Sequence, residues 1–109
     1  MNKARRNELK EIKSRFDGFV EELGELKDRI EELKDEIENV KDEEESAYEN
    51  MPESLQESER GERMQAAIDA MDNAIDGMDT AVTSVEGCME EVEQALADTD
   101  SYLQEAIDS

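Results

Sequence analysis

The fold of this chain is decided by residues 64–96, MQAAIDAMDNAIDGMDTAVTSVEGCMEEVEQAL. Apolar residues recur there at alternating spacings of four and three, and the pattern continues to Ala106. This heptad repeat keeps one row of side chains on one side of a long helix. The apolar row consists of Met64, Ile68, Met71, Ile75, Met78, Val82, Val85, Met89, Val92, Leu96, Thr99, Leu103 and Ala106.

A second heptad repeat precedes it. If Leu9 is position a of the heptad a–g, both a and d are apolar for five repeats. The a positions are Leu9, Phe16, Leu23, Ile30 and Ile37, and the d positions are Ile12, Phe19, Leu26, Leu33 and Val40. Helix propensity is high from about residue 2 to residue 50 and is weakest at Gly18 and Gly24, where we expect a softer turn.

The two repeats are separated by residues 51–58, which we expect to form a loop with one helical turn. Pro52 has no N–H and disfavours continuation of the first helix, but it suits the start of a new turn. Ser58 is a suitable N-cap for a second helix over about 59–108. We expect Leu55 to close the end of the paired helices.

The charges beside the two apolar rows favour an antiparallel arrangement. Antiparallel coiled coils bring the e positions of both helices together, and here one row is mostly Lys while the other is acidic. Folding the chain back predicts the pairs Lys41–Asp72, Lys34–Asp79, Lys27–Glu86 and Lys13–Asp100, all in one register. Each exposed pair contributes little, about 0–1 kcal/mol, so the pairs select the orientation while apolar burial stabilises it.

The sequence therefore predicts an all-α protein, an antiparallel two-helix coiled-coil hairpin with a single domain over residues 1–109. The alternative is a long parallel dimer through the first helix. Its g-to-e pairs would be mixed: Glu22 with Lys27 attracts, whereas Arg29 with Lys34 repels.

Small residues form a further row on the second helix, about 100° from the apolar row. Such residues let another backbone approach closely, and an isolated two-helix hairpin is marginally stable. We therefore expect two hairpins to pair into a four-helix homodimer through this small seam. The alternative is that the seam is a weakly apolar surface that makes no specific contact. The small seam is Ala67, Ala70, Ala74, Gly77, Ala81, Ser84 and Cys88.

Composition limits the functions that are open to the chain. Its net charge is −21, and 41% of its residues are charged. Phosphate would be repelled, so we expect no direct nucleic-acid partner. There is no His, and Cys88 has no basic neighbour to activate it, so we expect no enzyme activity, no catalytic residue, no metal and no cofactor.

The compartment is also suggested by composition. No apolar run approaches the roughly 18 residues of a membrane span, so we expect no membrane partner. A lone Cys fits a reducing compartment, and we expect a cytoplasmic protein.

Acidic residues dominate the second helix, which carries no Lys or Arg after Arg63. They either form a solvated face that keeps the protein soluble or a surface that binds a cationic partner. The acidic face is Asp69, Asp72, Asp76, Asp79, Glu86, Glu90, Glu93 and Asp100.

The central stretch MPESLQESERGE, residues 51–62, with the Ala-Ile-Asp-rich helix after it, resembles small acidic helical proteins of Firmicutes phages and mobile elements. The resemblance implies a phage accessory protein in the host cytoplasm. Small acidic phage proteins include inhibitors of restriction and CRISPR nucleases, some of them DNA mimics, although no inhibitor motif matches here.

We accordingly expect a non-catalytic protein-binding module. One hypothesis is inhibition of a basic host protein, such as a nuclease or another nucleic-acid-binding or defence protein, through acidic charge mimicry. The alternative is a structural coiled-coil dimerisation or spacer protein whose important surface is apolar.

Overall fold

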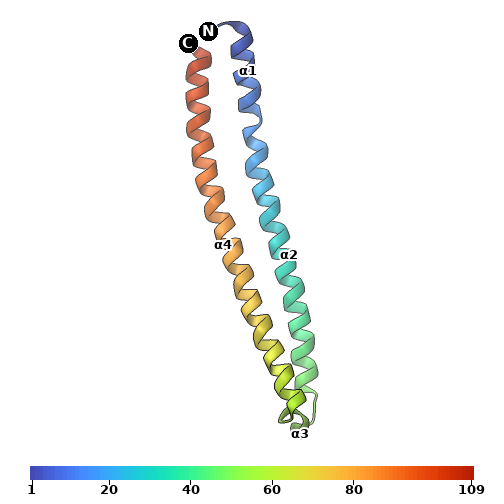
Figure 1. Cartoon of the computed structure of the whole chain (residues 1–109). Coiled ribbons are helices and arrows are strands. Elements are labelled where there is room, and N and C mark those ends of the chain that lie inside the picture. Colours follow the sequence, from blue (N-terminus) through green and yellow to red (C-terminus); the bar gives the residue numbers. More distant parts are fainter. The chain divides into compact units, whose positions relative to one another are not determined.

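The computed structural model describes residues 1–109, and all of its regular elements are helices. α1 spans Lys3–Ser14, α2 Phe16–Glu49, α3 Glu53–Gln56 and α4 Glu59–Asp108 (Figure 1). Helix accounts for 92% of the residues and there is no strand, so the predicted all-α class is confirmed. The long helices are rich in Ala, Leu, Glu and Lys, which have high intrinsic helix propensity.

The first long segment is divided at Arg15, where we expected an unbroken helix. Arg15 keeps a helical backbone, but its N–H donates to Ile12 O at 3.1 Å, three residues back instead of four. The Ser14 hydroxyl donates to Glu11 O at 2.6 Å and occupies the carbonyl that Arg15 would use in a regular helix. The interruption is therefore a local tightening of the helix. The two glycines where we expected the weak point lie inside α2.

The turn between α2 and α4 is held by local hydrogen bonds. Pro52 leads into α3 with φ −58° and ψ 145°. Gln56 Nε2 donates to Tyr48 O at 2.8 Å, which ties α3 back to α2. Ser58 caps α4, because its Oγ accepts from the Gly61 N–H at 3.5 Å and its carbonyl accepts from the Glu62 N–H at 3.0 Å.

Gly61 packs directly against the backbone of α3. A Cβ at Gly61 would lie 2.0 Å from Gln56 O and 2.5 Å from its carbonyl carbon, so no other residue fits without rearrangement. Leu55, which we expected to close the end of the helices, is instead 43% exposed.

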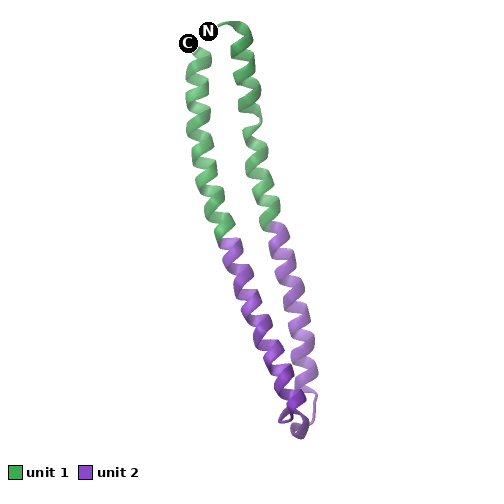
Figure 2. Cartoon of the chain, viewed as in Figure 1, with its two compact units in different colours: residues 1–27, 84–109 green, residues 28–83 purple.

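The chain forms two compact units (Figure 2). Unit 1 comprises residues 1–27 and 84–109, and unit 2 comprises residues 28–83. The most deeply buried apolar side chain of unit 1 is Ile107, at 7% exposure, and that of unit 2 is Ile68, at 4%. Most other apolar side chains of the packed faces are only half-buried, as expected where two helices meet without a third layer.

The apolar row of α4 is covered in both units. Every member from Met64 to Ala106 is buried or half-buried except Thr99. Within unit 1 this row lies against residues of α1 and the first part of α2, and within unit 2 against the remainder of α2. The heptad repeat therefore predicted the packed face of α4 correctly.

In α1 and α2 the covered heptad positions differ from those that we expected, which were a and d. The a positions are half-buried as predicted, but the d positions are all exposed. In their place the e positions, Lys13, Val20, Lys27, Lys34 and Lys41, are half-buried. The helix is thus rotated so that a and e face α4, which lets lysine stems cover apolar surface while their ammonium groups reach acidic partners.

Candidate functional site

Lysines of α1 and α2 pair with carboxylates of α4 in what we call the ion-pair ladder. All four predicted pairs are present, so that prediction is confirmed. The N–O distances are 3.4 Å for Lys13–Asp100 and 3.1 Å for Lys27–Glu86 in unit 1, and 2.6 Å for Lys34–Asp79 and 2.5 Å for Lys41–Asp72 in unit 2.

Two ladder lysines are held more firmly in their charged form than a free lysine. The hydrogen bond from Lys34 to Asp79 raises the lysine pKa above 10.5, and partial desolvation opposes the rise. The hydrogen bond from Lys41 to Asp72 raises its pKa in the same way. Carboxylates on α2 itself add to both effects, since Glu38 and Glu45 lie 3.8 and 3.5 Å from their respective lysines.

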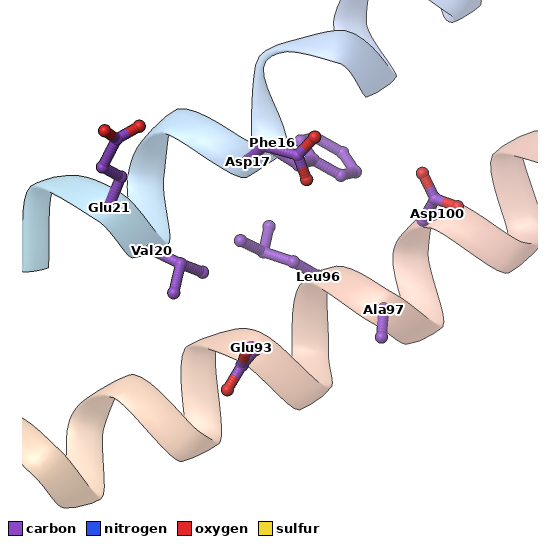
Figure 3. Close-up of a pocket in the computed structure, with 8 residues that line it drawn as sticks. All are labelled: Phe16, Asp17, Val20, Glu21, Glu93, Leu96, Ala97 and Asp100. Carbon is purple, nitrogen blue, oxygen red and sulfur yellow. The ribbon is translucent and has the colours of Figure 1, made fainter. Parts of the chain in front are cut away.

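The ladder is interrupted at Val20, the only e position without Lys. Glu93, on the same level of α4, consequently has no ion pair. A groove of about 500 Å³ opens here in unit 1, where Leu96 points toward Phe16 and Val20 (Figure 3). Its lining combines an apolar floor with carboxylates: Phe16, Asp17, Val20, Glu21, Glu93, Leu96, Ala97 and Asp100.

The predicted acidic face divides into two groups. Asp72, Asp79, Glu86 and Asp100 belong to the ion-pair ladder, so their charge is matched by lysine. Asp69 accepts a hydrogen bond from Gln65 at 3.1 Å but has no cationic partner. The remaining three, Asp76, Glu90 and Glu93, are exposed and form no ion pair. The acidic face is thus weaker than its composition alone indicates.

The small seam is open to solvent. All of its members are exposed except Ala81, which is half-buried. A Cβ at Gly77 would meet no atom within 4 Å, and Cys88 is exposed with a free thiol. Nothing in the chain covers these small residues. The role that we predict for them, as a dimer contact, remains a prediction.

The strongest departure from a self-contained helix pair is the row of d positions, which we call the apolar stripe. It consists of Ile12, Phe19, Leu26, Leu33 and Val40, which are between 40% and 54% exposed. Sequence reasoning assigned these residues to the core, because a heptad shows which residues share a face but not how the helix is rotated toward its neighbour.

In unit 2 the apolar stripe and the small seam meet in one groove of about 490 Å³. Leu33 and Val40 contribute the stripe, and Ala74 contributes the seam. The other lining residues are Glu36, Ile37, Met71 and Met78. Small side chains on α4 leave the groove open beside large exposed side chains on α2.

No helix has the length and apolar character that crossing a membrane requires. No three His, Cys, Asp or Glu side chains are grouped so that they could hold a metal ion.

Comparison with known proteins gives no relative for this arrangement. The chain matches no protein-family model, no curated protein sequence and no solved structure.

Proposed function

We propose that this chain is a non-catalytic protein-interaction module, a helical hairpin whose working surface is the apolar stripe. The observation that carries the proposal is the exposure of five large apolar side chains at intervals of seven residues. Scattered exposed apolar residues are ordinary, but a regular row of them is typical of a surface that binds a partner.

The row suits a helical partner. Residues seven apart lie on one face of a helix, which is how coiled-coil helices meet. Full burial of each such side chain would contribute about 1.5–3 kcal/mol, and about half of each remains available for burial. On this proposal the protein joins helices, as a structural coiled-coil or spacer module does.

Capture of partners from a lysate of the encoding organism tests the proposal. The wild-type chain and the Leu33→Asp variant are immobilised and washed at low and at high salt. We expect the wild type to retain partners, including further copies of itself, at both salt concentrations, and Leu33→Asp to lose them. Asp35→Asn, at another exposed α2 position, is the control. Equal retention by wild type and Leu33→Asp would contradict the proposal.

A second candidate function is binding of a basic protein surface by the acidic face. The gap in the ion-pair ladder favours it, because Glu93 lacks a cation beside an apolar floor that suits the stem of a Lys or Arg side chain. A nuclease or another nucleic-acid-binding protein offers such side chains.

This second function makes different predictions. Replacing Asp69, Asp76 and Glu90 by Asn or Gln would abolish binding without loss of helicity, and Val20→Lys would fill the gap and reduce it. Binding would weaken as salt rises, because exposed charges are screened. Partner retention unaffected by these changes and by salt would eliminate charge mimicry and leave the apolar stripe as the binding surface.

A further inference from the structure

The apolar stripe has a self-complementary set of charges beside it. The g positions follow each d position and lie next to the stripe on the side away from α4. They alternate in sign through its middle: Arg15, Glu22, Arg29 and Glu36. Glu22, Arg29 and Glu36 are exposed, and none of these three forms an ion pair within the chain.

We propose that the stripe is covered by a second copy of this chain, with the two α2 helices antiparallel and Leu26 at the two-fold axis. This inference rests on the proposed function and adds the identity, direction and register of the partner. Leu26 then meets Leu26 of the second copy, and Phe19 meets its Leu33. The partner's stripe would close the groove that Leu33, Val40 and Ala74 leave open.

The charges select this register. In an antiparallel pair the g positions of both helices lie on the same edge of the interface. With Leu26 on the axis, Arg29 lies opposite Glu22 of the second copy, and Glu36 opposite its Arg15. The symmetry makes each pair occur twice. A parallel pair would place each g residue beside an apolar a position and form none of these contacts.

The two copies have complementary charges only along the stripe, and elsewhere each chain is strongly acidic, with a net charge of −21. Two such chains repel wherever their acidic surfaces meet. The stripe carries two arginines along its edge, and the small seam beside it is uncharged. Only Glu8 and Glu43 would bring like charges together, at the far ends of the interface, where both side chains are exposed.

The packing within unit 1 places Cys88 at about the same level as Leu26, which is on the proposed axis. Lys27 and Glu86 are 3.1 Å apart, so Leu26 is level with about residue 87 of α4. Gly87 and Cys88 lie there, a Cβ at Gly87 would meet no atom within 4 Å, and Cys88 is exposed. Cys88 has the same heptad position on α4 as Ala74, so on this proposal it is on the helix face that the second copy approaches. Both Cys88 thiols would therefore be close to the axis.

Sedimentation equilibrium and oxidation of the purified full chain test the proposal. We expect a dimer at micromolar concentration, and copper–phenanthroline oxidation of the wild type should give a disulfide-linked dimer through Cys88. A monomer at all concentrations up to about 100-fold higher would overturn self-docking. The proposed function would still stand in that case if Leu33→Asp loses its captured partners.

A matched double variant, Cys88→Ser with Ala74→Cys, distinguishes the directions. Residue 74 is about 20 Å from residue 88 along α4, so in the antiparallel dimer the two new thiols are about 40 Å apart and should not crosslink. A parallel dimer through the small seam, in which equal residues of the two α4 helices are level with each other, would crosslink at either position. Crosslinking of the double variant, or its absence in the oxidised wild type, would overturn the proposed register.

Charge exchange tests the ion pairs. Arg29→Glu places like charges opposite each other twice and should weaken the dimer on the order of tenfold. Lys10→Glu, which changes the net charge equally at an exposed position away from the stripe, should have a smaller effect. Adding Glu22→Arg to Arg29→Glu should restore affinity. Failure of this restoration would overturn the assigned register.

Discussion

The turn between α2 and α4 and the apolar stripe of unit 2 are opposite extremes of packing. At the turn, Gly61 touches the backbone of Gln56 so closely that no Cβ fits. Along the stripe, Leu33 and Val40 are more than half exposed. The turn is thus packed within the chain, whereas the stripe is left about half uncovered.

The difference shows that two kinds of interaction define the fold. Steric fit of backbone atoms fixes the turn, and charged side chains fix the rotation of α2 against α4. The rotation that brings Lys34 and Lys41 to their acidic partners turns Leu33 and Val40 outward. Exposure of the stripe therefore accompanies formation of the ion-pair ladder.

The largest expected effect is at the turn. Gly61→Ala should destabilise the chain by at least about 3 kcal/mol, because the new Cβ collides with backbone atoms that cannot move independently. Gly77→Ala, at an open position in α4, should instead stabilise by about 0.5–1 kcal/mol through helix propensity. Urea denaturation followed by circular dichroism measures both. Equal effects at the two glycines would show that the turn is not tightly packed.

A smaller effect should separate the covered face from the stripe. Ile68→Ala removes a side chain that is 4% exposed and should cost about 2 kcal/mol. Val40→Ala, at 54% exposure, should cost less than about 1 kcal/mol when measured at a concentration where the chain is monomeric. If Val40→Ala were as costly as Ile68→Ala under those conditions, the stripe would be covered within the chain.

Reversing the charges of one ion pair of the ladder should have a still smaller effect on stability. Lys34→Asp would oppose Asp79 and lower the urea midpoint, and Asp79→Lys in the same chain should restore most of the loss. Lys10→Asp is the control, since Lys10 forms no ion pair. Absence of restoration in the double variant would mean that the ladder does not set the pairing of the helices.

The smallest expected effect is a decline of stability in alkali. The pKa values of Lys34 and Lys41 are raised in the folded chain, so their contribution is complete below the unfolded value and is lost as pH rises through the raised values. We expect the urea midpoint to fall between about pH 10 and pH 12, and to fall less in the Lys34→Gln/Lys41→Gln variant. An identical decline in that variant would assign the effect to other groups.

Much of this arrangement can be predicted from residue periods. The apolar row of α4 and all four ion pairs of the ladder follow from spacings of three, four and seven residues, because the spacing of residues along a helix determines which of them share a face. The covered face of α2 could not be predicted in the same way. Both d and e are compatible with the heptad, and only the match of Lys34 and Lys41 to their acids decides between them.

The local departures depend on contacts that a spacing pattern does not contain. The interruption at Arg15 arises because the Ser14 hydroxyl competes for one carbonyl. At the turn, Gly61 approaches the backbone of Gln56 closely and Leu55 is 43% exposed. A glycine after a predicted N-cap is the one signal that could have indicated this close approach.

The uniform ladder has a consequence for how the helices find their alignment during folding. A slip of one heptad would still place lysine opposite carboxylate, for example Lys34 opposite Glu86 and Lys41 opposite Asp79, so electrostatics alone allows several near-equivalent alignments. The close packing of Gly61 against Gln56 fixes the position of the turn and therefore selects one alignment of the ion pairs. Loosening it should therefore produce a mixture of shifted pairings.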